Sequence, residues 1–227
     1  GDAIDGKTFA DVDTVPELQA LADAAAAVMT GAAGGAAPTQ AQLAALGITG
    51  VTPANLAAVL AAIAATPDDG TGVDTLAELQ AVANAGANNA SNAAAAAAAL
   101  GAISAAAQAN NATDANVATS VFATAGVTGV DANNVAAIQS ALNSAAVNGL
   151  ATDTLPEVQA VVDAYNAIKA NADTAATTNA TQAQYAAIGV TGVDTPTKTN
   201  LLGDAIDGKT FADVDTVPEL QALADAA

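Results

Sequence analysis

Apolar residues recur every three to four positions in the stretch that follows each of three threonines, Thr14, Thr75 and Thr154. This spacing places the apolar side chains on one face of an α-helix, so each stretch predicts a helix that buries one face. The positions are Leu18, Leu21, Ala22, Ala25 and Val28 in the first stretch, Leu79, Val82 and Ala83 in the second, and Val158, Val161 and Val162 in the third.

Each stretch continues with signals for two further helices. Thr39-Gln-Ala-Gln42 and Thr181-Gln-Ala-Gln184 predict the starts of short helices. These helices are expected to end at Gly47 and Gly189, because glycine favours the left-handed residue after a helix. A corner of the form Gly-(Ile/Val)-Thr-Gly-Val follows, with its valine expected in the core. A third helix with its own apolar face, Leu56 to Ile63 in the first stretch, is predicted after the corner.

The sequence Thr-x-x-Glu-(Leu/Val)-Gln occurs four times, and its spacing reveals a repeat. The four motifs begin at residues 14, 75, 154 and 216, at intervals of 61, 79 and 62 residues. The corners begin at Gly47, Gly126 and Gly189, which lie 28, 28 and 27 residues before the next motif. Residues 1–25 recur without a change as residues 203–227, so the sequence has a period of 202 residues.

These signals predict an all-α fold of tandem three-helix units stacked into an elongated rod. The middle unit is longer than the others, and its extra Ala/Asn-rich residues predict a projecting helical hairpin. The expected parts are the tail of a preceding unit (1–13), unit 1 (14–74), unit 2 with the hairpin (75–153), unit 3 (154–215) and the start of the next period (216–227).

The four glutamates of the chain all lie three residues after a motif threonine. In this arrangement, the capping box, the threonine caps the helix and the glutamate side chain reaches back to the threonine amide. This exclusive placement favours structural caps over carboxylates used for acid–base catalysis or metal binding. The predicted caps are Thr14 with Glu17, Thr75 with Glu78, Thr154 with Glu157, and Thr216 with Glu219.

The charge and the missing residue types of the chain disfavour several classes of function. The chain has 23 acidic residues, four lysines and neither arginine nor histidine, which gives a net charge of −19. This charge disfavours nucleic acids and anionic membranes as partners. Without cysteine or histidine the commonest catalytic bases and nucleophiles are missing, so we expect no enzyme, no catalytic residue and no cofactor site. The most apolar stretch, Ala93–Ala107, is short and alanine-rich, and we expect no membrane insertion.

Aspartates cluster in the connectors before the motif threonines. Carboxylates and loop carbonyls are the ligands that Ca²⁺ prefers, although none of the connectors has the EF-hand pattern. Aspartates before a helix also stabilise the positive end of its dipole, and caps and turns are the favoured interpretation. The candidate ligands for a structural calcium ion are Asp68, Asp69, Asp74, Asp207, Asp213 and Asp215.

The Thr-x-Pro-Glu-Leu-Gln helices, the Leu-Gly-Ile-Thr-Gly-Val corners and the Asp/Gly connectors resemble the Ala-rich helical tandem repeats of giant bacterial extracellular proteins, of the adhesin-extender and surface-filament type. The resemblance implies an extracellular or cell-surface spacer, stalk or filament. Its partners would be neighbouring repeats of the same chain or identical subunits. The alternative is a binding module that presents a helical surface to a host protein, a glycan or ice.

Overall fold

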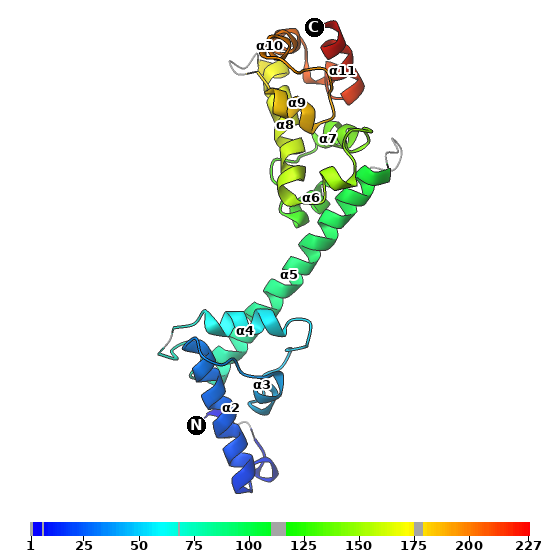
Figure 1. The fold of residues 1–227 in the computed structure, drawn as a ribbon. Coiled ribbons are helices and arrows are strands. Elements are labelled where there is room, and N and C mark those ends of the chain that lie inside the picture. The colour runs from blue at the N-terminus through cyan, green and yellow to red at the C-terminus, as the bar shows by residue number, and fades with distance from the viewer. Residues whose placement is uncertain (1, 6, 68, 110–116, 175–178) are drawn as a thin grey trace. The chain divides into compact units, whose positions relative to one another are not determined.

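The computed structural model describes residues 2–5, 7–67, 69–109, 117–174 and 179–227. The described residues form α-helices and three short 3₁₀ helices, with no strand among them, which confirms the all-α prediction (Figure 1). Contacts between residues divide the chain into two compact units, Gly1–Ala94 and Ala95–Ala227. Helix α5 (Leu76–Ala109) contributes its first part to unit 1 and its second part to unit 2.

Unit 1 contains α1 (Asp2–Asp5), the 3₁₀ helix η1 (Phe9–Asp11), α2 (Val15–Ala32), α3 (Gln40–Ala45), α4 (Leu56–Ala64) and the beginning of α5. Helices α3 and α4 both pack against α2. The predicted apolar faces supply the core, which includes Leu21, Val28, Leu43, Val59, Ile63 and Leu79. Gly86 allows α5 to approach α4 closely, because a Cβ atom there would lie 2.6 Å from Val59 Cα.

Unit 2 contains the end of α5, α6 (Thr119–Ala125), α7 (Val135–Leu142), η2 (Gly149–Ala151), α8 (Leu155–Thr174), α9 (Gln182–Ala187), α10 (Pro196–Asp207), η3 (Phe211–Asp213) and α11 (Val217–Ala226). Helix α8 lies at its centre and contacts α7, α9, α10 and η3 (Figure 1). Its core is built around the fully buried side chains of Phe122, Ile138, Tyr165, Ile168 and Tyr185.

The order helix, short helix, corner, helix occurs three times, as α2–α3–α4, α5–α6–α7 and α8–α9–α10. The predicted boundary between residues 74 and 75 nevertheless does not separate the two compact units, because α5 continues across the division. Leu79 and Ala83 at the start of α5 are buried in the core that α2, α3 and α4 form. The first helix of one sequence repeat therefore completes the core of the repeat before it.

The structure differs from the expected hairpin in the middle unit. The additional residues extend one continuous helix of 34 residues, α5, whereas α6 has seven residues, like its counterparts α3 and α9 with six each. The connection over residues 110–116 lies outside the described residues. The alanine run has no proline, and Gly101 interrupts it without ending the helix because alanines on both sides have the highest helix propensity.

Helix α5 is longer than the apolar stretch that the sequence singled out. Leu76–Gln108 is the one segment within the described residues that is long and apolar enough to cross a membrane by length and composition, with a mean hydropathy of 1.4 over its most apolar window. Only 17% of that window is buried. Alanine supplies most of this hydropathy, and alanine contributes little to membrane insertion compared with leucine or phenylalanine. The absence of membrane insertion stays a prediction.

Candidate functional site at the joints between repeats

Each joint begins with the predicted capping box. In all four copies the glutamate carboxylate accepts two hydrogen bonds from its threonine, one from the backbone N–H and one from the hydroxyl. The N···O and O···O distances are 3.0 and 2.8 Å for Thr14–Glu17, 3.2 and 2.8 Å for Thr75–Glu78, 3.0 and 2.7 Å for Thr154–Glu157, and 3.1 and 2.6 Å for Thr216–Glu219.

The cap hydrogen bonds stabilise the ionised glutamates. The hydrogen bonds from Thr14 hold the pKa of Glu17 below its usual value, and those from Thr154 do the same for Glu157. For Glu78 the largest cause of the lowered pKa is a hydrogen bond with Asp74, followed by those with Thr75. These carboxylates are therefore engaged in helix starts.

The corner residues form a turn that needs glycine at two places. The glycines that open and close the Thr-centred turn, such as Gly47 and Gly50, have φ values of 91° and 77°. The values are 88° and 78° in the second corner, and 86° and 80° in the third. A side chain at these φ values would be strained. The buried apolar residue of the corner is its second residue, Ile48, Val127 or Val190. The final valine, which was expected in the core, is fully buried only at Val193 and is half-buried in the other two corners.

A glutamine clamp joins each corner to the next helix. The side-chain amide of Gln80 pairs with the backbone of Thr49 in both directions: Thr49 N donates to Oε1 at 2.9 Å, and Nε2 donates to Thr49 O at 3.1 Å. The same two distances recur between Thr128 and Gln159 and between Thr191 and Gln221. The glutamine thus pairs with the N–H and C=O of a threonine about 30 residues earlier in the chain, and the near-constant spacing from corner to motif sets the register of this pairing.

The sequence pattern contained these glutamines but gave them no role. They stand in every copy of the motif, directly after the apolar residue that follows the capping glutamate. Each glutamine Nε2 also donates to the side chain four residues later, which orients the amide: Asn84 at 2.9 Å, Asp163 at 2.8 Å and Asp225 at 2.7 Å. The signal for this role in the sequence was the glutamine that follows the capping glutamate by two positions in all four motifs.

The other side of each corner is held by the third helix. Asn55 Nδ2 donates to Gly50 O at 2.9 Å, and Asn134 Nδ2 donates to Gly129 O at 2.7 Å. In the third corner Lys198 Nζ takes this place and donates to Gly192 O at 2.9 Å. The turn backbone is therefore held by side chains of its own repeat and by side chains of the next repeat, and in the second corner Asn166 Nδ2 also donates to Gly129 O at 3.1 Å.

The first motif has no corner to clamp. Gln19 Nε2 donates to Asp23 Oδ1 at 2.7 Å, which is the same orienting contact that the other three glutamines make. A corner about 30 residues before Gln19 would lie before Gly1, and within the given residues the amide is oriented as in the other joints.

The two identical 25-residue blocks differ sharply in burial. Residues 203–227 pack on α7 and α8: Val217 N donates to Ser140 Oγ at 3.0 Å, and Phe211 N donates to Asp173 Oδ1 at 3.0 Å. Lys169 Nζ lies 5.0 Å from the centre of the Phe211 ring, and Lys169 also forms an ion pair with Asp173. Phe211, Val217 and Leu220 of this block are buried, and Gln221 forms the clamp with Thr191.

The copy at the N-terminus exposes the same side chains. Phe9 is 82% exposed and Phe211 is 8% exposed; the fractions are 79% and 8% for Val15 and Val217, and 41% and 0% for Leu18 and Leu220. The exposed side chains include an apolar stripe on α2 formed by Leu18, Ala22, Ala25 and Met29. The corresponding stripe on α8 is buried at Val158, Val162 and Tyr165 and half-buried at Lys169, and the one on α5 is buried at Leu79, Ala83 and Gly86.

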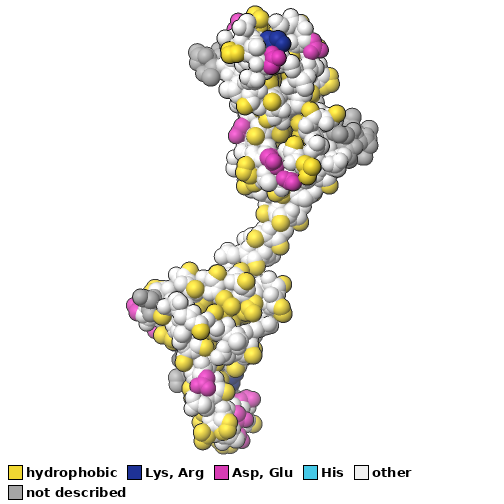
Figure 2. Space-filling view, viewed as in Figure 1, with side chains coloured by type: hydrophobic (Ala, Val, Ile, Leu, Met, Phe, Trp, Pro, Cys, Tyr) yellow, Lys and Arg dark blue, Asp and Glu magenta, His cyan; other side chains and the backbone are white. Residues whose placement is uncertain are grey.

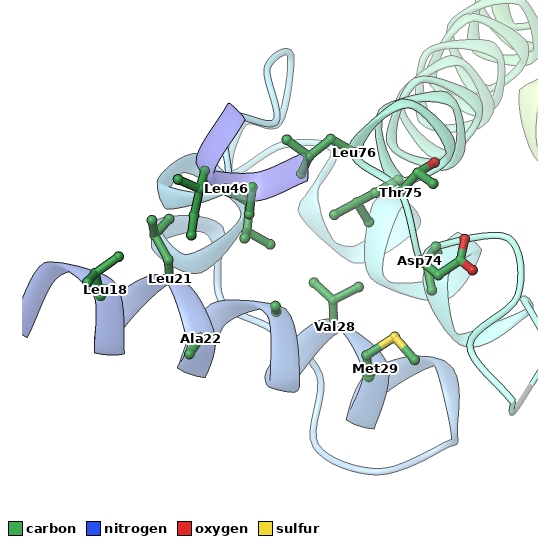
Figure 3. A pocket seen from close by; sticks show the side chains of 14 residues that line it. Leu18, Leu21, Ala22, Val28, Met29, Leu46, Asp74, Thr75 and Leu76 are labelled. Atoms are coloured by element: carbon green, nitrogen blue, oxygen red, sulfur yellow. The ribbon is translucent and has the colours of Figure 1, made fainter. Parts of the chain in front are cut away.

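An open apolar groove of about 350 Å³ runs along this stripe (Figure 3). Leu18, Ala22 and Met29 of α2 line it together with Leu46, Leu76 and residues of α1. Tyr165, which is fully buried, stands on α8 where α2 has Ala25. The four-residue α1 corresponds to the last part of the twelve-residue α10, which packs on α8 and α11.

Three of the calcium candidates, Asp69, Asp213 and Asp215, contact residues close to them in the sequence. Asp69 accepts from Thr71 N and Oγ1 in a turn, and Asp213 accepts from Thr210 N and Oγ1 as the cap of η3. Asp215 lies beside Glu219, and partial burial together with this carboxylate raises its pKa. Within the described residues no three acidic side chains are grouped to hold a metal ion.

The structure describes two of the remaining three candidates. Asp74 contacts Glu78, Asp207 lies half-buried at the end of α10, and Asp68 lies outside the described residues. Asp69 and Asp213 have the turn and cap roles that were preferred from the sequence. A structural calcium ion stays a prediction.

The two buried tyrosines offer no activated hydroxyl. Burial raises the pKa of Tyr165 above its usual value and the pKa of Tyr185 to about 12, so both hydroxyls stay protonated at neutral pH. On the face drawn in Figure 2 the acidic side chains lie singly or in small groups over the surface. Comparison of the chain with protein-family models, curated proteins and solved structures finds no match.

Proposed function

We propose that the chain is a structural extracellular repeat protein whose units join in series to form a spacer, stalk or filament. The observation that carries the proposal is the glutamine clamp, which joins the corner of one repeat to the first helix of the next with the same geometry three times. A joint that is repeated with unchanged hydrogen bonds transmits a constant geometry from repeat to repeat, as a spacer requires.

The charge and composition support the same role. A net charge of −19 keeps neighbouring chains apart and soluble, so that association depends on specific joints. The buried surface of each repeat is small and rich in alanine, and the first helix of the following repeat supplies part of its core. Stability then increases with the number of neighbours, which is the behaviour of proteins built from stacked repeats.

The proposal is tested by adding a period. A chain in which residues 1–202 occur twice before residues 203–227 is compared with the 227-residue chain by urea denaturation and by electron microscopy, with and without Ca²⁺. We expect a higher denaturation midpoint and particles that are longer by a constant increment for each added period. Equal midpoints, or particles that grow in all directions, would contradict a serial spacer.

A further inference from the structure

We propose that Asn148 is a self-modification site, whose side-chain amide is lost by attack of the Gly149 backbone nitrogen when the end of α5 releases Gly149. Asn148-Gly149 is the one Asn-Gly pair of the chain. Glycine after asparagine favours this reaction, because glycine has no side chain that hinders its nitrogen. The site lies within one repeat, between α5 and η2, and is separate from the glutamine clamps.

Gly149 is held by two side chains that lie one turn apart on α5. Gly149 N donates to Gln108 Oε1 at 3.2 Å, and Ser104 Oγ donates to Gly149 O at 2.8 Å. Gly149 is buried, and a Cβ atom there would lie 3.0 Å from Ser104 O and from Gln108 Cβ. The nitrogen that would attack Asn148 therefore points its hydrogen at α5 and not at water.

The side chain of Asn148 is exposed and is oriented by the backbone that follows it. Leu150 N donates to Asn148 Oδ1 at 3.0 Å, so the carboxamide is turned toward the first residues of η2. A hydrogen bond to a carbonyl oxygen stabilises the negative charge that this oxygen gains when a nucleophile attacks the carbon. The carboxamide is thus placed for reaction with a backbone nitrogen, and the nitrogen is the group that α5 holds.

The reaction needs only water and hydroxide. Hydroxide removes the proton of Gly149 N, and the nitrogen forms a bond to Asn148 Cγ. The C–N bond of the side-chain amide then breaks, and its nitrogen takes a proton from water and leaves as ammonia, which restores the hydroxide. Water finally opens the cyclic imide at either of its carbonyl groups. The products are aspartate and isoaspartate at position 148.

The contact with α5 opposes the first step. If Gly149 N lost its proton in place, it would give up the hydrogen bond to Gln108 and leave a charge buried away from water, which is costly. The Gly149 N–H must therefore leave Gln108 before hydroxide removes its proton. Local opening of one segment costs less than unfolding of the whole unit. We expect the rate at Asn148 to follow the opening of this contact and not the unfolding of unit 2.

Isoaspartate prevents the contact from forming again. In this product the main chain before Gly149 is longer by one carbon atom. The surroundings of Gly149 leave no space for an added atom, because even a Cβ atom would lie 3.0 Å from Ser104 O. A single opening of this contact is thus converted into a permanent release of the end of α5.

The test follows deamidation of the full chain in mildly alkaline buffer and locates the modified residue by peptide mass spectrometry. Gln108→Ala removes the acceptor of Gly149 N. It should raise the rate at Asn148 several-fold, toward the rate of the chain unfolded in guanidinium chloride. Gln108→Glu keeps an oxygen acceptor at this position and should leave the rate near that of the wild type. Gln159→Ala is the matched control, since it removes a glutamine from another contact of unit 2 and should not change the rate.

Three results would overturn the proposal, and none of them bears on the spacer role. The first is a folded wild type that is modified at Asn148 as fast as the unfolded chain. The second is a Gln108→Ala chain that is modified no faster than the wild type. The third is equal acceleration by Gln108→Ala and Gln159→Ala, because the reaction would then follow the stability of unit 2 as a whole. The isoaspartate fraction should also show faster hydrogen exchange at the end of α5, and unchanged exchange there would contradict its permanent release.

Discussion

Phe9 and Phe211 occupy the same position in two identical blocks of sequence, yet 82% of Phe9 is exposed and only 8% of Phe211. The difference arises from the neighbours alone. Phe211 N donates to Asp173, and Lys169 covers the ring, whereas the block that contains Phe9 has no repeat before it in this sequence. The local sequence is the same in both blocks. A difference in stability between matched variants at Phe9 and Phe211 therefore reports the contribution of burial.

This pair gives a direct stability test. Phe211→Ala should lower the free energy of unfolding of unit 2 by about 3 kcal/mol, because it empties a buried site that no neighbour can fill. Phe9→Ala removes an exposed ring and should change stability by less than about 0.5 kcal/mol. Urea denaturation followed by circular dichroism measures both. Equal losses for the two variants would mean that Phe9 is also buried in solution.

Local signals in the sequence predicted the helix starts and the corners well. Thr39 and Thr181 begin short helices as expected, and Gly47 and Gly189 end them in the left-handed conformation. These features depend on residues within one turn of the chain, so a pattern of a few positions determines them.

The partners of each helix could not be predicted in the same way. The side chain of Gln80 pairs with Thr49, which lies 31 residues earlier, and no local preference reports such a contact. The compact units divide inside α5 because its first part packs with the preceding repeat, as Gly86 against Val59 shows. The additional residues that were expected in a hairpin lengthen α5 among the described residues, because the alanine-rich segment forms a helix by itself.

The clamp can be tested against its unpaired copy. Gln159→Ala should destabilise unit 2 by about 1 kcal/mol, since the Thr128 backbone loses a donor and an acceptor. Gln19→Ala removes the same residue where no corner is held, and its effect should be close to zero. Thermal unfolding of the two variants provides the comparison. A similar loss in both would assign the effect to the contact with the side chain four residues later rather than to the clamp.

Acid should weaken the joints through the capping glutamates. The pKa of Glu157 is lowered in the folded protein, so its ionised form stabilises the fold above the unfolded value of about 4.5. That contribution is lost as the pH falls below this value and through the lower folded pKa. We expect the stability of unit 2 to decline below about pH 4.5 for this reason.

Glu157→Gln is the matched variant for this pH dependence. Thr181 forms the same capping box with Gln184, at 2.8 Å from Thr181 N, so glutamine can replace the carboxylate without losing the hydrogen bond. The variant should resemble the wild type at neutral pH and lose less stability between pH 5 and pH 3. Denaturation midpoints over this range measure the slope. An unchanged slope would exclude Glu157 as a source of the acid sensitivity.

Two glycines of α5 predict opposite effects of the same substitution. A Cβ atom at Gly86 would lie 2.6 Å from Val59 Cα and 2.8 Å from Ala58 O, so Gly86→Ala must push α4 away from α5. We expect a loss of about 1–3 kcal/mol in unit 1, as for other overpacked sites. A Cβ atom at Gly101 would meet nothing within 4 Å, and Gly101→Ala should stabilise the helix by about 0.5–1 kcal/mol. Hydrogen exchange of α4 and α5 distinguishes the two changes, because only Gly86→Ala should speed exchange in α4. If α4 were as protected in Gly86→Ala as in the wild type, the close packing of α5 on the preceding repeat would not exist in solution.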